Sequence, residues 1–367
     1  MNSSDSLKLV VKQQNLEDIS HYIYAIVYPI VFLLGIVGNL LSSLLFSVTK
    51  LNRTSCGVYF LLLAVFDTIA LIGGLHHCLN IGYRVAIPNA TYCRARVFLV
   101  YVSMDMTSWM IVAISVDRYL KVKYPITARI YATQKLAMIV SSIIMIIFIV
   151  KNVHLATVFI GDFSSNAADN CDANPLYPKY VAFFHNVWPW IDLTTYALFP
   201  FLIVTICNAF IIHDQYKRRV KLRKRNLDRS LITLLLVSSI SLILCNLPIT
   251  ILAGVYTHIS TSTNTNDTYD SVAFAFDLLR IPSYGSFAFN FYLYYYSSDI
   301  FRQQVILLFH RIFRIKPKTN DIELTERTYP DASRYENRLY SIDEFDDYQT
   351  PMPSLNGSSY ISNFYSQ

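Results

Sequence analysis

Charged residues are scarce in this sequence: Asp, Glu, Lys and Arg make up 15% of its 367 residues, against roughly 25% in an average soluble domain. Glycine and proline are few, with 10 and 13 residues, which excludes collagen-like and low-complexity chains. Six cysteines are too few for a disulfide scaffold. Hydrophobic residues make up 53% of the chain, more than a soluble protein of this length can bury. The composition therefore predicts a membrane protein.

Seven apolar stretches are long enough to cross the hydrocarbon core of a membrane, which takes about 20 residues. They cover residues 22–48, 57–79, 97–122, 136–160, 188–212, 231–256 and 272–296. The seventh is the least apolar, because it contains Asp277, Arg280 and Pro282. The runs lack the period-two alternation of a membrane β-barrel. We therefore predict an all-α membrane protein with seven transmembrane helices.

Lysine and arginine gather in the loops that follow spans one, three and five, most densely between residues 217 and 229. Because cytoplasmic loops carry the excess of positive charge, the N-terminus is expected outside the plasma membrane and the C-terminus in the cytoplasm. N-x-Ser/Thr triplets in the predicted outside segments indicate glycosylation at Asn2, Asn89 and Asn266. The net charge of +6 is explained by these loops, so membrane lipid is an expected partner and nucleic acid is not.

The chain is expected to have four parts. Residues 1–21 form an extracellular N-terminus and residues 22–297 the seven-helix bundle. Residues 298–314 alternate apolar and basic positions in the pattern of an amphipathic helix on the inner membrane surface. Residues 315–367 are polar, with the composition of a disordered cytoplasmic tail.

Short motifs that contain polar residues or proline interrupt the apolar spans at specific places. They are Gly38-Asn39, Asp67, Asp117-Arg118-Tyr119, Pro200, Cys245-Asn246-Leu247-Pro248, Asn290-Phe291 and Tyr294. In this order and spacing, the chain between residues 22 and 313 resembles a rhodopsin-like (class A) G-protein-coupled receptor. Asn290-Phe291 and Asn208 give a looser resemblance to invertebrate FMRFamide-type neuropeptide receptors.

The resemblance implies a polar network in the middle of the membrane. An acid at this depth is costly and usually functional, and Asp67 is such a residue. A family-like site would hold a sodium ion, since oxygen and amide ligands suit a hard cation; the alternative is a hydrogen-bonded network alone. Its members would be Asn39, Asp67, Thr107, Ser286 and Asn290. No other cofactor is expected.

The resemblance also implies a switch at the cytoplasmic side. Arg118 would pair with Asp117 and Asp228 and, once released, would meet the G-protein; Tyr119 and Tyr294 belong to the same motifs. The alternative is that Arg118 only reaches toward the interface. The two helix prolines, Pro200 and Pro248, would be hinges for an outward movement of span six. Phosphorylation of the tail would recruit arrestin.

Two cysteines, Cys93 and Cys171, lie on the predicted outside, where a disulfide between them is expected.

Other positions depart from the family pattern: Asn246 stands where Trp is usual, Phe291 where Pro is usual, and Ser108 where Ile is usual. These departures affect the expected activation switch and leave the fold prediction unchanged.

The ligand is expected to be a small peptide or a lipid. Val100 replaces the acid of amine receptors, and Tyr284 replaces the lysine that binds retinal. Asp105 and Asp192 have no obvious local partner, so a cationic ligand group would satisfy them. Asp277 and Arg280 either contact the ligand or pair with each other across one helical turn. The aromatic residues Tyr101 and Tyr284 are further candidates for ligand contact.

Our hypothesis is a neuropeptide receptor that signals through a heterotrimeric G-protein. The alternatives are a lipid or other small-molecule receptor of the same fold and, less favoured, a transporter, a channel or a retinal protein. No internal repeat favours a transporter. No metal-ligand cluster or nucleophile triad favours an enzyme.

Overall fold

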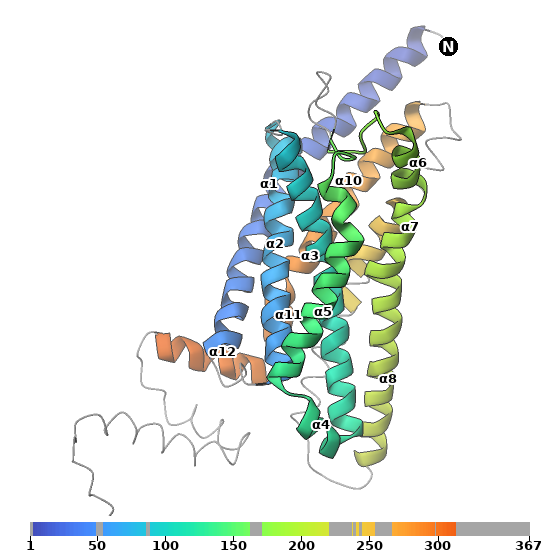
Figure 1. Ribbon diagram of the computed structural model, residues 1–367. Coiled ribbons are helices and arrows are strands. Elements are labelled where there is room, and N and C mark those ends of the chain that lie inside the picture. Colours follow the sequence, from blue (N-terminus) through green and yellow to red (C-terminus); the bar gives the residue numbers. More distant parts are fainter. Residues whose placement is uncertain are drawn as a thin grey trace, which may run out of the picture. The chain divides into compact units, whose positions relative to one another are not determined.

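The computed structural model describes residues 3–48, 54–85, 89–161, 171–219, 237, 240–241, 244–253, 266–297 and 299–312 (Figure 1). Contacts divide the chain into two units, Met1–Arg311 and Ile312–Gln367, and the helices discussed below belong to the first unit apart from Ile312, the last residue of the last helix. Every regular element of the described residues is a helix, and the only β geometry among them is an isolated bridge between Ile160 and Ala173. The all-α prediction is confirmed.

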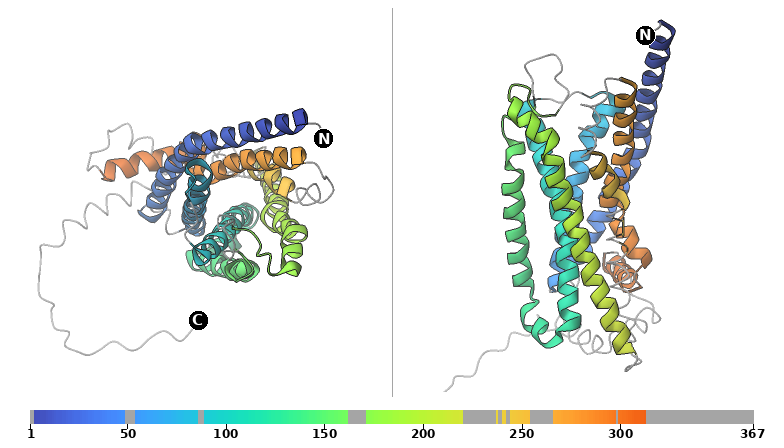
Figure 2. Two further views of the ribbon diagram at one scale, coloured as in Figure 1. Left: turned by 90° about the horizontal axis from the view of Figure 1, so that it is seen from above. Right: turned by 90° about the vertical axis from the view of Figure 1, so that its right-hand side faces the viewer.

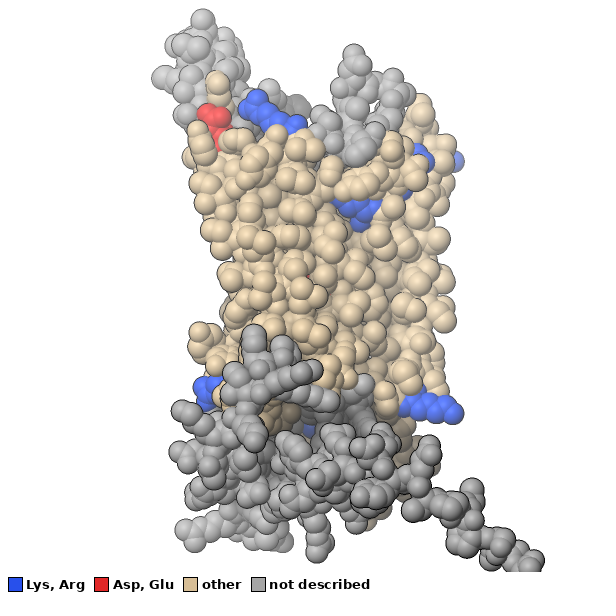
Figure 3. Space-filling view, turned by 90° about the vertical axis from the view of Figure 1, so that its left-hand side faces the viewer, with Lys and Arg blue, Asp and Glu red and all other residues tan. Residues whose placement is uncertain are grey.

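Five of the predicted spans appear as helices that are long and apolar enough to cross a membrane. They cover Asp18–Val48, Ser55–Tyr83, Ala90–Lys123, Gln134–Ala156 and Pro178–Asp214. Most of the sixth predicted span lies outside the described residues, although its segment Leu244–Ala253 is an apolar helix. The seventh forms α10 (Asn266–Ala288), which contains Asp277 and Arg280, and α11 (Asn290–Ser297), and it is not among these five helices. On the face drawn in Figure 3, a wide band without charged residues separates lysines and arginines at its two ends.

The first helix, α1, runs over Ser3–Val48 and begins earlier than the predicted span. Its 46 residues correspond to about 69 Å of α-helix, more than twice the thickness of the hydrocarbon core. In Figure 1 its N-terminal part extends beyond the neighbouring α2 and α10. The predicted N-terminal segment 1–21 is therefore helical over its described residues.

Side-chain caps define the starts of the next three long helices. Thr54 accepts a hydrogen bond from the Gly57 N–H at the start of α2 (Ser55–Tyr83). Asn89 accepts one from Tyr92 at the start of α3 (Ala90–Lys123), and Thr133 caps α5 (Gln134–Asn152) in the same way. These residues satisfy backbone N–H groups that a helix start leaves without a partner. The short α4 (Pro125–Tyr131) and α6 (Pro178–Asn186) begin instead with proline.

The fifth span consists of three consecutive segments. They are α7 (Trp188–Asp192), the π-helix η3 (Leu193–Leu198) and α8 (Phe199–Arg219). A π-helical turn accommodates an extra residue within a helix, often at a functional site. The 3-10 turn η2 (Val153–Ala156) follows α5 on the fourth span.

The third helix, α3, has neighbours on several sides: it packs against α2, α5, η3 and α8, while α1 packs against α2 and α10 (Figure 2). Because α3 packs against α2, α5 and α8, it can connect groups on the second, fourth and fifth spans. Gly38 of α1 allows close approach to α11, because a Cβ there would lie 3.1 Å from the Cβ of Phe291.

The helix α12 (Asp299–Ile312) occupies the segment predicted to be amphipathic. Its buried Phe301 packs against Phe46 and Tyr294.

Candidate functional site

The predicted disulfide between Cys93 and Cys171 is present, with the two Cα atoms 5.6 Å apart. It joins the buried start of α3 to the segment that leads into α6. Backbone hydrogen bonds from Gly161 to Asp172 and from Asn174 to Phe159 hold the same segment to the end of the fourth span. We call this end of the bundle the disulfide end, and the opposite end, which carries Asp117, the Asp117 end.

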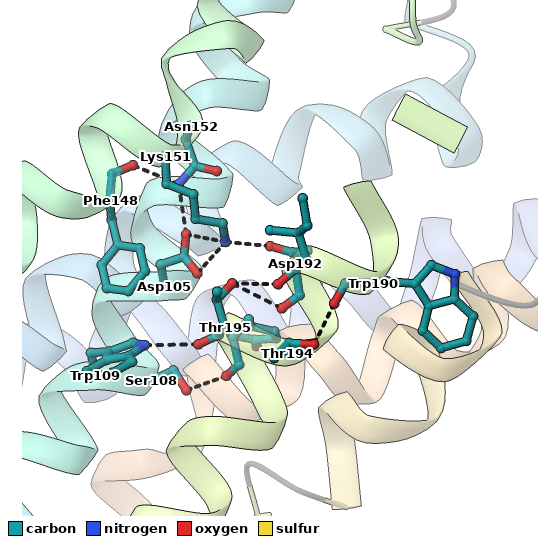
Figure 4. A network of polar contacts seen from close by, with 12 residues as sticks. Asp105, Ser108, Trp109, Phe148, Lys151, Asn152, Trp190, Asp192, Thr194 and Thr195 are labelled. Carbon is teal, nitrogen blue, oxygen red and sulfur yellow. Dashed lines mark hydrogen bonds and ion pairs between the residues drawn. The ribbon is translucent and has the colours of Figure 1, made fainter. Parts of the chain in front are cut away.

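A lysine of α5 joins two carboxylates toward the disulfide end (Figure 4). The Lys151 ammonium lies 2.9 and 3.0 Å from the two carboxylate oxygens of Asp105 on α3. It also lies 2.9 Å from Oδ1 of Asp192 at the end of α7. The side chains of Asp105, Lys151 and Asp192 are 1%, 11% and 15% exposed. The two acids, for which the sequence offered no obvious local partner, are thus both paired with Lys151, which is 46 residues from Asp105 and 41 from Asp192.

Further groups complete this cluster, which we call the acidic cluster. The Asn152 amide donates to Asp105 across 2.7 Å. The Lys151 ammonium also lies 5.2 Å from the ring centroid of Trp188, and Trp188 packs against Tyr101. Two carboxylates against one ammonium give the cluster a formal charge of −1. A buried charge that is not balanced is costly, so the cluster favours one further positive group.

Two side chains of α3 bind carbonyls of η3. Ser108 donates to the Tyr196 carbonyl across 2.6 Å, and the Trp109 indole donates to the Thr195 carbonyl across 2.9 Å. These carbonyls lie four and five residues before Pro200, which has no N–H to offer either of them. The unusual Ser108 therefore has a structural reason: its hydroxyl gives the Tyr196 carbonyl the hydrogen-bond donor that Pro200 lacks.

The predicted mid-membrane network is present in part. Asp67, which is fully buried, accepts hydrogen bonds from Thr107 across 2.8 Å and from Asn290 across 2.7 Å. The Asn39 amide instead donates to the Phe287 carbonyl of α10, and the Ser286 hydroxyl donates to the Ser283 carbonyl. Three of the five predicted members thus meet, and the hydrogen bonds of the other two run to other groups.

Asn246, a departure from the family pattern, forms a second polar network with α10. Its amide nitrogen donates to Ser286 across 3.0 Å, and its carbonyl oxygen accepts from Ser283 across 2.6 Å. All three side chains are buried. Ser283 was not among the predicted residues, although a serine on the same helix face as Ser286 is a signal that could have identified it.

At the Asp117 end, Asp117 accepts hydrogen bonds from Ser55 and from Lys121, each across 2.7 Å. Tyr119 accepts one from Lys123, and the buried Tyr294 packs against Phe60 and Phe301. The predicted partner Asp228 lies outside the described residues, so the pairing of Arg118 stays a prediction.

The remaining predicted residues have separate positions. Asp277 and Arg280 form an ion pair across one turn of α10, one of the two alternatives considered for them, with 3.8 Å between their charged atoms. Tyr284 packs edge-on against Tyr28 of α1. Pro200 lies in α8 and Pro248 in the segment Leu244–Ala253. Asn89 caps α3 and Asn266 is the first residue of α10, whereas Asn2 lies outside the described residues.

Comparisons with known proteins identify the family. Residues 38–290 match the model of the 7 transmembrane receptor (rhodopsin family). Human G-protein coupled receptor 65 is 26% identical over 275 residues, which cover 72% of this chain and 78% of the relative. Mouse cysteinyl leukotriene receptor 2 is 25% identical over 301 residues, or 81% and 94% of the two chains.

A third relative, the Xenopus laevis cholecystokinin receptor, is 27% identical over 156 residues, which cover 38% of this chain and 33% of the relative. Two of these relatives are named for ligands, cysteinyl leukotrienes and cholecystokinin, and these ligands differ. What they share with this chain is the seven-span receptor architecture, which carries no enzymatic activity. The chain belongs to the rhodopsin family of seven-transmembrane, G-protein-coupled receptors.

Proposed function

We propose that this receptor responds to an extracellular peptide that carries a basic residue, in the manner of a neuropeptide receptor, and passes the signal to a heterotrimeric G-protein. The observation that supports this proposal is the acidic cluster of Asp105, Lys151 and Asp192. A guanidinium or ammonium group of a peptide would balance its charge of −1 by charge-assisted hydrogen bonds. Trp188 and Tyr101 beside it suit an aromatic neighbour in the same peptide.

The proposed orientation places the disulfide end outside the plasma membrane and the Asp117 end in the cytoplasm. The basic loops support this, as does the position of the Cys93–Cys171 disulfide, which needs an oxidising compartment. In this orientation Asn2, Asn89 and Asn266 are proposed to be glycosylated. The G-protein and, after phosphorylation of the tail, arrestin would bind at the Asp117 end, while α12 would lie against membrane lipid.

We also propose that Asp67 holds a sodium ion. The carboxylate of Asp67, the hydroxyl of Thr107 and the amide of Asn290 are brought together by direct hydrogen bonds. The carboxylate, the hydroxyl and the oxygen of the amide are all oxygen ligands, which suit a hard cation. Thr107 and Asn290 orient the carboxylate, and the bound ion would neutralise its charge.

The test of the peptide proposal is a signalling screen in cells that express the full-length receptor. Peptides with and without a C-terminal Arg-Phe-amide, and a panel of lipids, are applied while calcium and cAMP are recorded. We expect a basic peptide to activate, and its analogue with citrulline in place of arginine to be weaker. Activation by lipids alone would contradict the proposal and support a lipid receptor instead. Asp192→Asn should lower the potency of the arginine peptide more than that of the citrulline analogue. Equal losses of potency would show that Asp192 does not contact the arginine.

A further inference from the structure

A second group of charged residues lies at the disulfide end, on a different face of α3 from the acidic cluster. Arg96 precedes Asp105 by nine residues, which corresponds to about 14 Å along the helix axis and about half a turn around it. Its guanidinium points toward α2, where Nη1 donates to the Gly73 carbonyl across 3.4 Å. Asp105 on the other face bonds to Lys151 of α5. The two clusters are therefore separated by the width of α3.

The second group is positively charged. Arg280 of α10 contacts the ring of His77 on α2 and lies over the ring of Phe276. The positive charges of Arg96 and Arg280 repel each other, and both also disfavour a positive charge on His77. The carboxylate beside them is Asp277, which pairs with Arg280. Two guanidinium groups against one carboxylate give a formal charge of +1.

Within the described part of the chain, Arg96 has no acidic partner. The groups that act on it electrostatically are Arg280, Tyr284 and Tyr92. Its Nε atom is buried without a hydrogen-bond partner among the described residues, and so is Nε2 of His76, a side chain that is 8% exposed. His76 and Arg96 are within electrostatic range of each other. A partly buried guanidinium with an N–H group left without an acceptor and no counter-ion is costly for a protein to keep, unless another molecule supplies the anion.

We propose that Arg96, His76 and Arg280 form a second ligand subsite that binds a carboxylate group of the ligand. A guanidinium offers paired N–H donors that match the two oxygens of a carboxylate. Tyr101 lies between Arg96 and Asp105 on α3 and packs against Trp188, which borders the acidic cluster. The inference rests on the proposed function for the acidic cluster, and it makes the preferred ligand dipolar: one positive group for Asp105 and Asp192, and one carboxylate for Arg96 and Arg280.

The test compares each activating ligand with a neutral counterpart in cells that express the full-length receptor. For a peptide, the free C-terminal carboxylate is compared with the amide, and internal Asp or Glu with Asn or Gln; for a lipid, the acid is compared with its primary amide. The two peptide arms show which carboxylate is bound. The potency ratio of acid to neutral form is measured in the wild type, Arg96→Gln, Arg280→Gln and the control Lys179→Gln. Lys179 is an exposed cation of the same end, in α6.

We expect the wild type to prefer one acid form by about 10- to 100-fold. The ratio should approach one in Arg96→Gln and Arg280→Gln and stay unchanged in Lys179→Gln. A wild-type ratio near one, or a preference that persists in both arginine variants, overturns the inference. A lipid acid that gives the expected pattern supports the subsite and rejects the peptide proposal. Basic peptides that activate equally well in their acid and neutral forms support the peptide proposal and overturn the second subsite.

A measurement without ligand completes the test. If Arg96 is kept for an external anion, replacing it removes an unbalanced charge, so purified Arg96→Gln should unfold at the same temperature as the wild type or higher. A fall of several degrees, absent from Lys179→Gln, would show that Arg96 stabilises the fold itself and would overturn the inference. This result does not depend on finding an activating ligand.

Discussion

The Ser108 hydroxyl lies 2.6 Å from the carbonyl oxygen of Tyr196, four residues before Pro200. In an α-helix this carbonyl would accept the N–H of residue 200, which proline lacks. The contact therefore joins the third span to the fifth at the turn where the fifth is π-helical. Both residues are almost fully buried, so water is poorly placed to supply the missing donor.

We expect Ser108→Ala to lower the free energy of unfolding by about 1–3 kcal/mol, the usual cost of an unsatisfied buried carbonyl. Thermal unfolding of the detergent-solubilised receptor measures the effect. Ser115→Ala is the matched control, since Ser115 is equally buried on the same helix but bonds to Ile111, one turn back along its own helix. Equal losses in the two variants would contradict a special role for the Tyr196 contact.

Replacing Lys151 should expose the repulsion between Asp105 and Asp192. Breaking a buried ion pair on one side leaves an uncompensated charge, so Lys151→Met is expected to cost about 3–5 kcal/mol. The double variant Lys151→Met with Asp192→Asn restores the charge of −1 and should recover part of the loss. Thermal unfolding compares these variants with Lys135→Met, an exposed lysine of the same helix. If the double variant is less stable than Lys151→Met, charge balance is not what Lys151 provides.

The apolar spans, the disulfide and the Asp277–Arg280 pair could be predicted from the sequence, because each depends on local composition, on a family motif or on residues one turn apart. The partner of Asp105 could not, since Lys151 is 46 residues away. Lys151 nevertheless stands within a strongly apolar run, and a charge in such a run signals a buried partner. The Ser108–Tyr196 contact required the position of the π-helix, which depends on packing between spans. Ser283 was missed for the same reason, as its bond to Asn246 depends on how the two helices face each other.

Asn246 is expected to restrain the sixth span by its two hydrogen bonds to Ser283 and Ser286 of α10. Asn246→Leu removes both bonds at similar volume, which lowers the cost of moving the sixth span away from α10. We expect basal G-protein activation, measured as nucleotide exchange in membranes at matched receptor amounts, to rise several-fold. Thr250→Val is the control, because the Thr250 hydroxyl bonds to carbonyls of its own helix, those of Asn246 and Leu247. Unchanged basal exchange in Asn246→Leu would reject the restraint.

Sodium binding at Asp67 predicts a stability difference between salts of equal ionic strength. A ligand that binds the folded state stabilises it by RT ln(1 + [L]/Kd), or about 1.4 kcal/mol at ten times the dissociation constant. The receptor should therefore unfold at a higher temperature in sodium chloride than in choline chloride. Asp67→Asn removes the charge that attracts the ion but keeps the size of the side chain, so the difference should disappear. Asp105→Asn is the control, because that buried carboxylate already pairs with Lys151, and its variant should keep the sodium dependence. A wild type that is equally stable in both salts, or an Asp67→Asn variant that still responds to sodium, would show that Asp67, Thr107 and Asn290 form a hydrogen-bonded network without an ion.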